Sequence, residues 1–302
     1  MDIYLPIANM SVNALLIVAL GGLVGLLSGM FGVGGGFLTT PLLIFYGIPP
    51  TVAVASATTQ ITGSSVSGVY AHMRRGGVDL KMGLVMIAGG AIGSLAGAGL
   101  FRLLQNSGQI DLVIGFLYVM LLGGIGGLML KDALTALGWV EVEAPKERPR
   151  HNRWIAALPL RWRFYASGLY LSPVAPFILG FAAGVMTVLL GIGGGFILVP
   201  AMIYLLGMAP RVVVGTSLIM ILAVSAVTTM IHAMTTQAVD IVLAGLLLAG
   251  GVVGAQYGAV LETRLKPDLL RFALAAIILA VALRMFLGLT WRPDEIFSIE
   301  NL

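Results

Sequence analysis

The sequence has no cysteine and few charged residues, and both shortages exclude kinds of chemistry. Because cysteine is absent from all 302 residues, disulfide frameworks and thiolate metal sites are excluded. Asp, Glu, Lys and Arg together make up 10% of the chain, against about 25% in an average soluble domain. With three histidines and 13 acidic residues, no spacing in the chain indicates a metal site or a carboxylate pair. We therefore predict no metal, no cofactor and no enzymatic activity.

The excess of positive charge is small and does not indicate a nucleic-acid-binding protein. The net charge is +4, and the basic residues fall mainly between apolar segments. Loops on the cytoplasmic side of membrane proteins are enriched in Lys and Arg, so topology explains this distribution. We predict the lipid bilayer as the surroundings of the chain and no nucleic-acid partner.

Apolar sequence is what the chain has in abundance. Hydrophobic residues make up 59% of it, and the mean hydropathy is +1.02. A helix needs only about 20 apolar residues to cross a bilayer. Ten apolar segments occupy residues 12–30, 36–47, 51–71, 82–101, 110–130, 174–190, 195–207, 212–232, 239–261 and 270–290. The sequence therefore predicts an all-α polytopic membrane protein with about ten membrane segments, two of them short.

Two glycine runs of the same form indicate that the chain is duplicated. The first reads Gly-Val-Gly-Gly-Gly-Phe over residues 32–37, and the second reads Gly-Ile-Gly-Gly-Gly-Phe over residues 191–196. Further pairs keep nearly the same offset: Pro41 and Pro200, His72 and His232, and the ladders Gly89, Gly93, Gly97 and Gly250, Gly254, Gly258. Internal repeats change the reading of a whole fold. We predict a first membrane repeat over residues 1–131, a polar cytoplasmic linker over 132–170, and a second repeat over 171–302.

Two topologies fit this pattern. If every apolar segment crosses, each half has five spans and the second half is inverted relative to the first; Lys and Arg near residues 74–81 and 131–163 then face the cytoplasm. Alternatively, each glycine run is the tip of a re-entrant hairpin, which gives eight spans and parallel repeats. We prefer five plus five. Because the segment 36–47 reaches only about 18 Å at about 1.5 Å per residue, its glycine end should lie within the membrane.

A helix that begins inside the bilayer exposes unpaired N–H groups and the positive end of its dipole. Such helix starts bind anions readily, and glycine lets a ligand approach the backbone. Inverted repeats would direct two such starts at one site near the midplane. The predicted substrate contacts are Gly34, Gly35, Gly36, Phe37, Gly193, Gly194, Gly195 and Phe196. The alternative is that these glycines serve close helix packing.

Polar side chains downstream of the glycine runs are further candidates. Ser56, Thr59, Gln60, Thr216 and Ser217 are predicted to donate hydrogen bonds to an anion, with Thr39 and Thr187 as weaker candidates. The alternative is that they bond backbone or neighbouring helices, at about 0.6 kcal/mol each. His72 and His232 end matching segments and titrate where proton coupling would operate. We favour an interfacial helix cap for both histidines and keep proton coupling as the functional hypothesis.

The motifs resemble those of the TauE/SafE-like sulfite exporters, also called the toluene sulfonate uptake permease family. The resemblance rests on the segment 25–37 with Pro41, on its echo over residues 184–200, and on the segments 55–58 and 215–217. It covers about residues 13 to 287. It implies a multi-pass transporter of the bacterial inner membrane for small sulfur-containing anions such as sulfite or sulfonates.

Three functions differ in the residues that they require. A secondary transporter would expose a midplane site alternately to the two sides. An intramembrane enzyme would need a nucleophile and a base at depth, whereas the histidines lie at segment ends. A non-transporting scaffold subunit would need only the glycine ladders. We expect a transporter with a small anionic substrate. The exact substrate, the direction, the coupling ion and the oligomeric state, including a homodimer, stay open.

Overall fold

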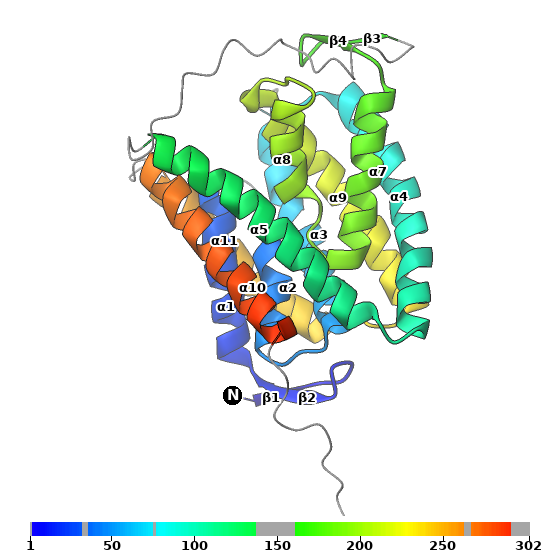
Figure 1. Cartoon of the computed structure of the whole chain (residues 1–302), viewed down its shortest axis with the longest axis vertical. Coiled ribbons are helices and arrows are strands. Elements are labelled where there is room, and N and C mark those ends of the chain that lie inside the picture. Colours follow the sequence, from blue (N-terminus) through cyan, green and yellow to red (C-terminus); the bar gives the residue numbers. More distant parts are fainter. Residues whose placement is uncertain (1, 32–35, 75–76, 137–160, 263–266, 291–302) are drawn as a thin grey trace, which may run out of the picture.

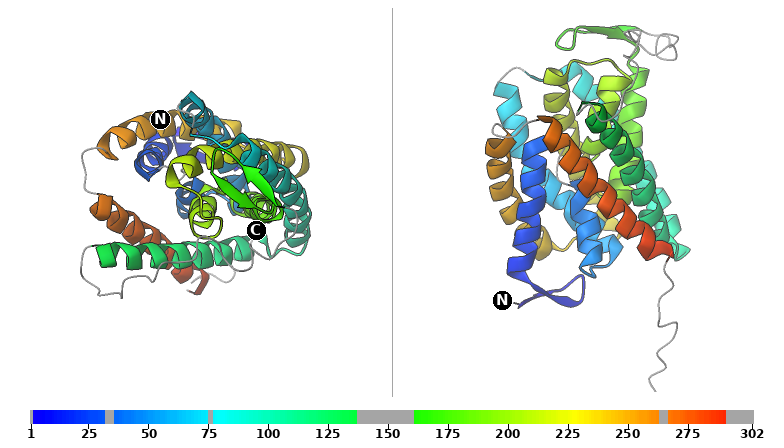
Figure 2. Two further views of the ribbon diagram at one scale, coloured as in Figure 1. Left: turned by 90° about the horizontal axis from the view of Figure 1, so that it is seen from above. Right: turned by 60° about the vertical axis from the view of Figure 1, so that its left-hand side comes forward.

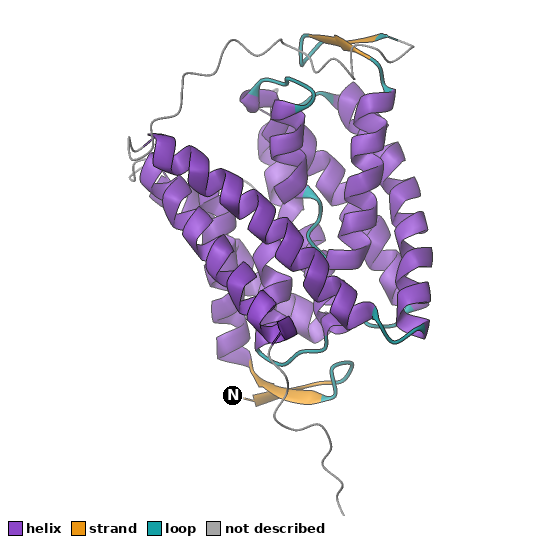
Figure 3. Ribbon diagram, viewed as in Figure 1, coloured by secondary structure: helices purple, strands orange, loops and turns teal. Residues whose placement is uncertain are grey.

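The computed structural model describes residues 2–31, 36–74, 77–136, 161–262 and 267–290, and these form a bundle of helices with a short hairpin at each end (Figures 1 and 3). The first half contains β1 (Asp2–Leu5), β2 (Met10–Asn13), α1 (Ala14–Phe31), α2 (Gly36–Phe45), α3 (Pro50–Arg74), α4 (Leu80–Asn106) and α5 (Ile110–Ala136). The second contains β3 (Trp162–Phe164), β4 (Leu169–Leu171), α7 (Val174–Leu190), α8 (Gly195–Tyr204), α9 (Pro210–Thr235), α10 (Ile241–Glu262) and α11 (Pro267–Thr290). Each predicted apolar segment corresponds to one helix, with ends shifted by a few residues.

The helices have the length and composition of membrane segments. Among the described residues, five helical stretches are long and apolar enough to cross a bilayer: 80–106, 110–135, 212–235, 241–258 and 272–290. Shorter apolar helices occupy 14–30, 36–45, 174–190 and 195–204. The prediction of an all-α polytopic membrane protein is therefore confirmed.

The chain reverses its direction between α1 and α2. The backbone N–H of Asn13, just before α1, donates to the hydroxyl of Tyr46, just after α2, at 3.2 Å. The start of α1 and the end of α2 therefore lie at the same end of the molecule. The hairpin β1–β2 lies at that end, and the hairpin β3–β4, which leads into α7, lies at the opposite end (Figure 1). Five segments per half require such a path, while the inverted repeat itself stays a prediction.

Each half packs against the other through matching helices. α1 packs against α10, and α4 packs against α7, while α3 pairs with α9. α5 and α11 lie side by side along one face of the bundle (Figure 2). These reciprocal contacts are those that a two-fold relation between the halves would produce, and they support the predicted duplication.

The glycine ladders allow two of these contacts to be very close. A Cβ atom on Gly93 of α4 would overlap the carbonyl oxygen of Phe181 on α7. A Cβ atom on Gly254 of α10 would likewise overlap the carbonyl oxygen of Gly22 on α1. Small residues at helix interfaces let backbones approach in this way. Both ladders therefore lie at close contacts between helices of the two halves.

The two hairpins were not predicted from the sequence. β1 pairs antiparallel with β2, and β3 pairs with β4, in strands of only four and three residues. Residues 162–171 fall in the stretch assigned to a polar linker, and α5 continues into that stretch as far as Ala136. Strands this short carry too little alternating pattern to be recognised. Residues 137–160 lie outside the described part of the chain.

Candidate functional site

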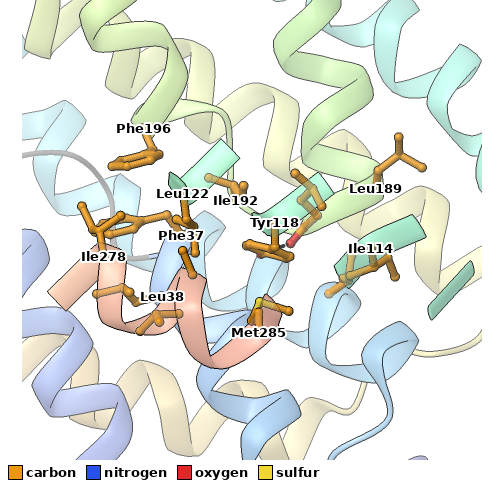
Figure 4. Close-up of a cluster of buried hydrophobic side chains, with 14 of the residues drawn as sticks. Phe37, Leu38, Ile114, Tyr118, Leu122, Leu189, Ile192, Phe196, Ile278 and Met285 are labelled. Atoms are coloured by element: carbon orange, nitrogen blue, oxygen red, sulfur yellow. Dashed lines mark hydrogen bonds between the residues drawn. The ribbon is translucent and has the colours of Figure 1, made fainter. Parts of the chain in front are cut away.

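The starts of α2 and α8 meet in the middle of the bundle. Phe37 and Phe196, each the second residue of its helix, stack with ring centroids 4.5 Å apart and an interplanar angle of 8°. Their exposed fractions are 1% and 2%, and they belong to a buried cluster that also includes Tyr118 and Ile192 (Figure 4). The structure thus brings together the two helix starts that the sequence singles out, with an aromatic pair between them.

The second glycine run adopts a backbone that requires glycine. Gly191, Gly193 and Gly194 have φ angles of +70°, +71° and +77°, in the left-handed region that other residues rarely adopt. A Cβ atom on Gly191 would also lie 2.7 Å from the carbonyl oxygen of Val54 on α3. Of the first run, Gly34 and Gly35 lie outside the described residues, whereas Gly36 begins α2 and is buried.

The end of α7 before this run has its carbonyl groups occupied. The N–H of Gly191 donates to the carbonyl of Thr187 at 2.8 Å, and the hydroxyl of Tyr118 donates to the carbonyl of Leu190. The Nε2 atom of His232 lies 3.1 Å from the carbonyl oxygen of Val188. Side chains from α5 and α9 therefore satisfy the negative end of the α7 dipole, which leaves it little electrostatic influence on a ligand.

His232 is buried between helices of the bundle. Its exposed fraction is 1%, its Nδ1 atom lies 3.3 Å from the hydroxyl oxygen of Thr236, and its ring meets Phe101 edge-on at 5.0 Å. From the sequence we favoured a histidine that caps its own helix at the membrane interface. That interpretation did not include the contact with the carbonyl of Val188, which belongs to another helix, α7. His72 is half-buried on α3, and its carbonyl oxygen accepts the N–H of Gly77.

The start of α8, in contrast, keeps free donors. The carbonyl of Gly194 accepts the N–H groups of Ile197 and Leu198, at 3.1 and 2.8 Å. The N–H groups of Gly195 and Phe196 donate to no other described residue. Unpaired donors at a buried helix start are rare because each loses its bond to water. This helix start therefore has the backbone groups that an anion site needs.

A side chain beside the same run also lacks a partner. The hydroxyl oxygen of Ser225 on α9 is buried and has no hydrogen-bond partner among the described residues. It lies 3.3 Å from where a Cβ atom of Gly193 would be. The hydroxyl of Thr187 lies 3.6 Å from the corresponding position at Gly194, although it also donates to the carbonyl of Ala183. Ser225 is not among the residues predicted from the sequence to bind substrate, because its place beside the glycine run appears only in three dimensions.

Around α2 one polar pair is bonded, while the buried hydroxyl of Thr40 has no hydrogen-bond partner among the described residues. The hydroxyl of Thr39 donates to Oε1 of Gln60 at 3.1 Å, and both residues are buried. The Nε2 atom of Gln60 faces α10, 3.0 Å from where a Cβ atom of Gly251 would lie. The predicted candidate Gln60 therefore lies next to α2 and across from the second half.

The other predicted hydroxyls make bonds within the protein. Ser217 donates to the carbonyl of Val214 at 3.0 Å, and Thr59 donates to the carbonyl of Ala55 at 3.1 Å. Thr59 also lies 3.5 Å from the hydroxyl of Thr229 on α9. These bonds agree with the structural alternative considered for this group, and a substrate role for these residues stays a prediction.

Thr216 belongs to a network around a buried carboxylate. Its hydroxyl oxygen accepts the N–H of Asp79 at 2.9 Å. Asp79 caps α4 by accepting the N–H of Met82 at 3.0 Å, and its other oxygen accepts both the N–H and the hydroxyl of Ser167, at 3.0 and 2.6 Å. Asp79 therefore joins α4 and the turn between β3 and β4 through its carboxylate, and α9 through its backbone N–H.

Ser56 belongs to a second network of the same kind. Its hydroxyl oxygen accepts the N–H of Asp240 at 3.2 Å. Asp240 caps α10 by accepting the N–H of Leu243 at 3.0 Å, and it accepts the N–H of Ile7, between β1 and β2, at 3.2 Å. The sequence signal was available, because Val78-Asp79-Leu80 and Val239-Asp240-Ile241 match at the offset of the glycine ladders. This match is not among the pairs that indicate the duplication above, because those pairs are glycines, prolines and histidines.

Two cavities formed by described residues lie away from the helix starts. One, of about 350 Å³, is an apolar groove between α1 and α10. The other, of about 250 Å³, is bounded by the end of α2, the start of α5 and the last turns of α11. The stacked rings of Phe37 and Phe196 thus fill the centre in this conformation.

Comparison with known proteins identifies the family. The family model described as "Sulfite exporter TauE/SafE" matches residues 17–285. The chain belongs to this family. No solved structure matches it.

Relatives of the family extend over nearly the whole chain. A "Probable membrane transporter protein" of Xylella fastidiosa is 28% identical over 94% of this chain and 97% of its own length. The "Probable membrane transporter protein YjnA" of Bacillus subtilis is 30% identical over 89% and 98%. The "Sulfite exporter TauE/SafE family protein 3" of Arabidopsis thaliana is 33% identical over 39% and 27%. The protein is a multi-pass membrane transporter of the TauE/SafE family, and it is not an enzyme.

Proposed function

We propose that this TauE/SafE protein is a secondary transporter of small sulfur-containing oxyanions, such as sulfite or sulfonates, and that the anion binds at the start of α8. The observation that carries the proposal is the set of unpaired donors there. The N–H groups of Gly195 and Phe196 and the hydroxyl of Ser225 have no acceptor in the described part of the chain. An oxyanion supplies acceptors for all three.

The electrostatics of this region favour a negative ligand. The α8 dipole places partial positive charge at its start, while the carbonyls at the end of α7 are already bonded to Tyr118 and His232. In a buried site, charge-assisted hydrogen bonds to an oxyanion are roughly twice as strong as neutral ones. The glycines leave no Cβ atoms in the way of a compact ligand, so small anions are preferred to bulky ones.

The aromatic pair supplies the barrier that such a transporter needs. Phe37 and Phe196 stack between the two halves and are almost fully buried, so the conformation described is closed at its centre. Alternating access requires α2 and α8 to separate, in turn, toward each side. Because each ring belongs to a different half, a relative movement of the halves unstacks the pair. The rings thus link opening of the path to exposure of the α8 start.

Orientation and coupling are part of the same proposal. Arg74 and Lys81 flank the turn between α3 and α4, and Arg163 lies in β3, at the end opposite the N-terminal hairpin. The excess of positive charge assigns that end to the cytoplasm of the inner membrane. His232 links α9 to the end of α7 beside the glycine run, and proton coupling through His232 and its counterpart His72 stays a prediction.

A binding and flux experiment tests the proposal. Purified protein is titrated with sulfite and with ethanesulfonate, and uptake of both is measured in proteoliposomes. We expect Ser225→Ala to weaken anion binding about tenfold, because the hydroxyl would lose a hydrogen bond to a charged group. Ser107→Ala is the matched control, since its exposed hydroxyl bonds the carbonyl of Leu104 at the end of α4. Unchanged binding in folded Ser225→Ala, or no uptake above empty liposomes, would contradict the proposal.

A further inference from the structure

Two opposite charges line the cavity among α2, α5 and α11. Asp111 lies in the first turn of α5, and Arg284 lies in the last third of α11. The remaining lining is mostly apolar: Ile44, Phe45, Pro50, Gly115, Met285, Gly288 and Leu289. The volume of about 250 Å³ holds a ligand with a few heavy atoms. The site is separate from the glycine runs, and nothing in the proposed transport mechanism uses it.

Neither charge is neutralised by a residue that the structure describes. No ion pair joins Arg284 or Asp111 to any residue in the described ranges. The guanidinium carbon of Arg284 lies 5.2 Å from the centroid of the Phe45 ring. This cation–π contact holds the guanidinium by its face and leaves the N–H groups along its edge free for an acceptor.

The cavity also lies at the start of α5. Asp111 and Gly115 belong to the first two turns of this helix, and the carbonyl of Gln109, just before the helix, accepts the N–H of Val113 at 3.0 Å. The helix start therefore contributes positive potential to the cavity, next to the guanidinium. Asp111, in the first turn of the same helix, adds a carboxylate to the cavity lining. The lining as a whole suits a ligand that carries both signs of charge.

We propose that this cavity binds a small zwitterion, with its phosphate or other oxyanion group on Arg284 and its ammonium group on Asp111. The planar guanidinium pairs with oxyanions through two parallel hydrogen bonds, and a carboxylate accepts from an ammonium. Such a ligand has two sources: a free solute on the side that carries the N-terminal hairpin, or the head group of an ethanolamine phospholipid. The proposal does not depend on the α8 site.

The first arm of the test uses a soluble probe. Purified full-length protein is titrated with O-phosphoethanolamine, with ethyl phosphate, which lacks the ammonium group, and with ethanolamine, which lacks the anion. We expect O-phosphoethanolamine to bind at least about tenfold more tightly than either. Arg284→Gln should reduce its affinity about tenfold, and Asp111→Asn should remove the preference over ethyl phosphate.

The second arm tests lipid, and control variants accompany both arms. Protein is placed in nanodiscs of phosphatidylethanolamine or phosphatidylglycerol, and retained lipid is counted by native mass spectrometry. Arg102→Gln and Asp2→Asn remove exposed charges from α4 and β1, outside the cavity, and should behave as the unmodified protein. Binding in the soluble arm indicates a free solute, and ethanolamine-lipid retention that Arg284→Gln and Asp111→Asn abolish indicates a head group. Either result supports the site.

Three results would overturn the proposal. One is the lack of a preference for the zwitterion or its lipid in both arms. Another is an equal loss of binding in Arg284→Gln and Arg102→Gln. The third is loss of binding in Ser225→Ala with no change in Arg284→Gln, because that pattern would assign the probe to the α8 site. Thermal unfolding of each variant verifies that the exposed substitutions leave the fold intact.

Discussion

The two halves of the molecule use the same framework and place different side chains on it. Beside α2, the first half has Thr39 and Gln60, joined by a hydrogen bond. At the matching offsets the second half has Leu198 and Met220, both fully buried in an apolar cluster. The backbone features recur, including the proline inside each short helix. The difference teaches that matching helices in the two halves need not carry the same polar side chains.

The asymmetry also appears in what each glycine run leaves unpaired. Near α8, the N–H groups of Gly195 and Phe196 and the hydroxyl of Ser225 have no partner among the described residues. Near α2, Thr39 and Gln60 bond each other, and only the hydroxyl of Thr40 has no described partner. A ligand site needs donors that are not already used. Our proposal therefore places the anion at α8, where backbone donors are unpaired, and the first half contributes the opposing ring of Phe37 and the bonded pair Thr39 and Gln60. The predictions below test this comparison, starting with the largest effect.

Substitution in the second glycine run should have the largest effect. Gly191→Ala would put a side chain at a φ of +70° and 2.7 Å from the carbonyl of Val54, so we expect the free energy of unfolding to fall by about 4 kcal/mol. Gly36→Ala has no positive φ, and part of its overlap is with the flexible side chain of Ile61, so the loss should be smaller. Chemical unfolding in micelles measures both. Gly245→Ala, in open space on α10, is the control, and equal losses at 191 and 36 would contradict the comparison.

The two buried aspartates should differ in their contribution. The Asp79 carboxylate accepts from Met82 and twice from Ser167, whereas that of Asp240 accepts from Leu243 and Ile7. We expect Asp79→Ala to lower the free energy of unfolding by about 3 kcal/mol and Asp240→Ala by about 2 kcal/mol, because each leaves helix-start donors without an acceptor. The same unfolding assay ranks them. A larger loss at Asp240 would show that the N-terminal hairpin is the better anchored.

Exchanging the side chains that distinguish the halves sharpens the comparison. Met220→Gln would bury an amide in an apolar cluster and should lower the free energy of unfolding by about 2 kcal/mol. Gln60→Met would remove the bond to Thr39 and should lower it by about 1 kcal/mol. Unfolding and anion uptake are measured together. If Met220→Gln is tolerated as well as Gln60→Met, the chemistry of the two halves is interchangeable and the asymmetry has no functional meaning.

The aromatic pair should give the smallest and most symmetric effect on stability. Phe37→Leu and Phe196→Leu each remove one member of the stack, so we expect similar losses of about 1 kcal/mol. Both should also raise anion leak through proteoliposomes, because the stack is the proposed barrier. Leu122→Met, in the same cluster but outside the stack, serves as the control. A leak in only one of the two phenylalanine variants would argue against a shared barrier.

Much of the fold could be predicted because the information is local. The ten apolar segments recur as helices, since a helix in a membrane must be long and apolar wherever it lies. The short segments after each glycine run were also predicted, and Phe37 and Phe196 do meet. The two hairpins were missed, because strands of three or four residues are fixed by their contacts with Asp79 and Asp240 and not by their own pattern.

The sequence by itself determined that this protein is a membrane-spanning helical protein with paired glycine runs, because hydropathy and spacing act along one chain. That it is a transporter followed from its membership of the TauE/SafE family. Only the tertiary structure decided which polar groups are used and which are left over. Ser56 and Thr216 accept hydrogen bonds from the backbone N–H groups of Asp240 and Asp79, while Ser225 has no partner in the part of the chain that the structure describes. Hydroxyls of the same type differ in this way because a hydrogen bond depends on distance and angle between groups far apart in sequence, and composition carries no information about either.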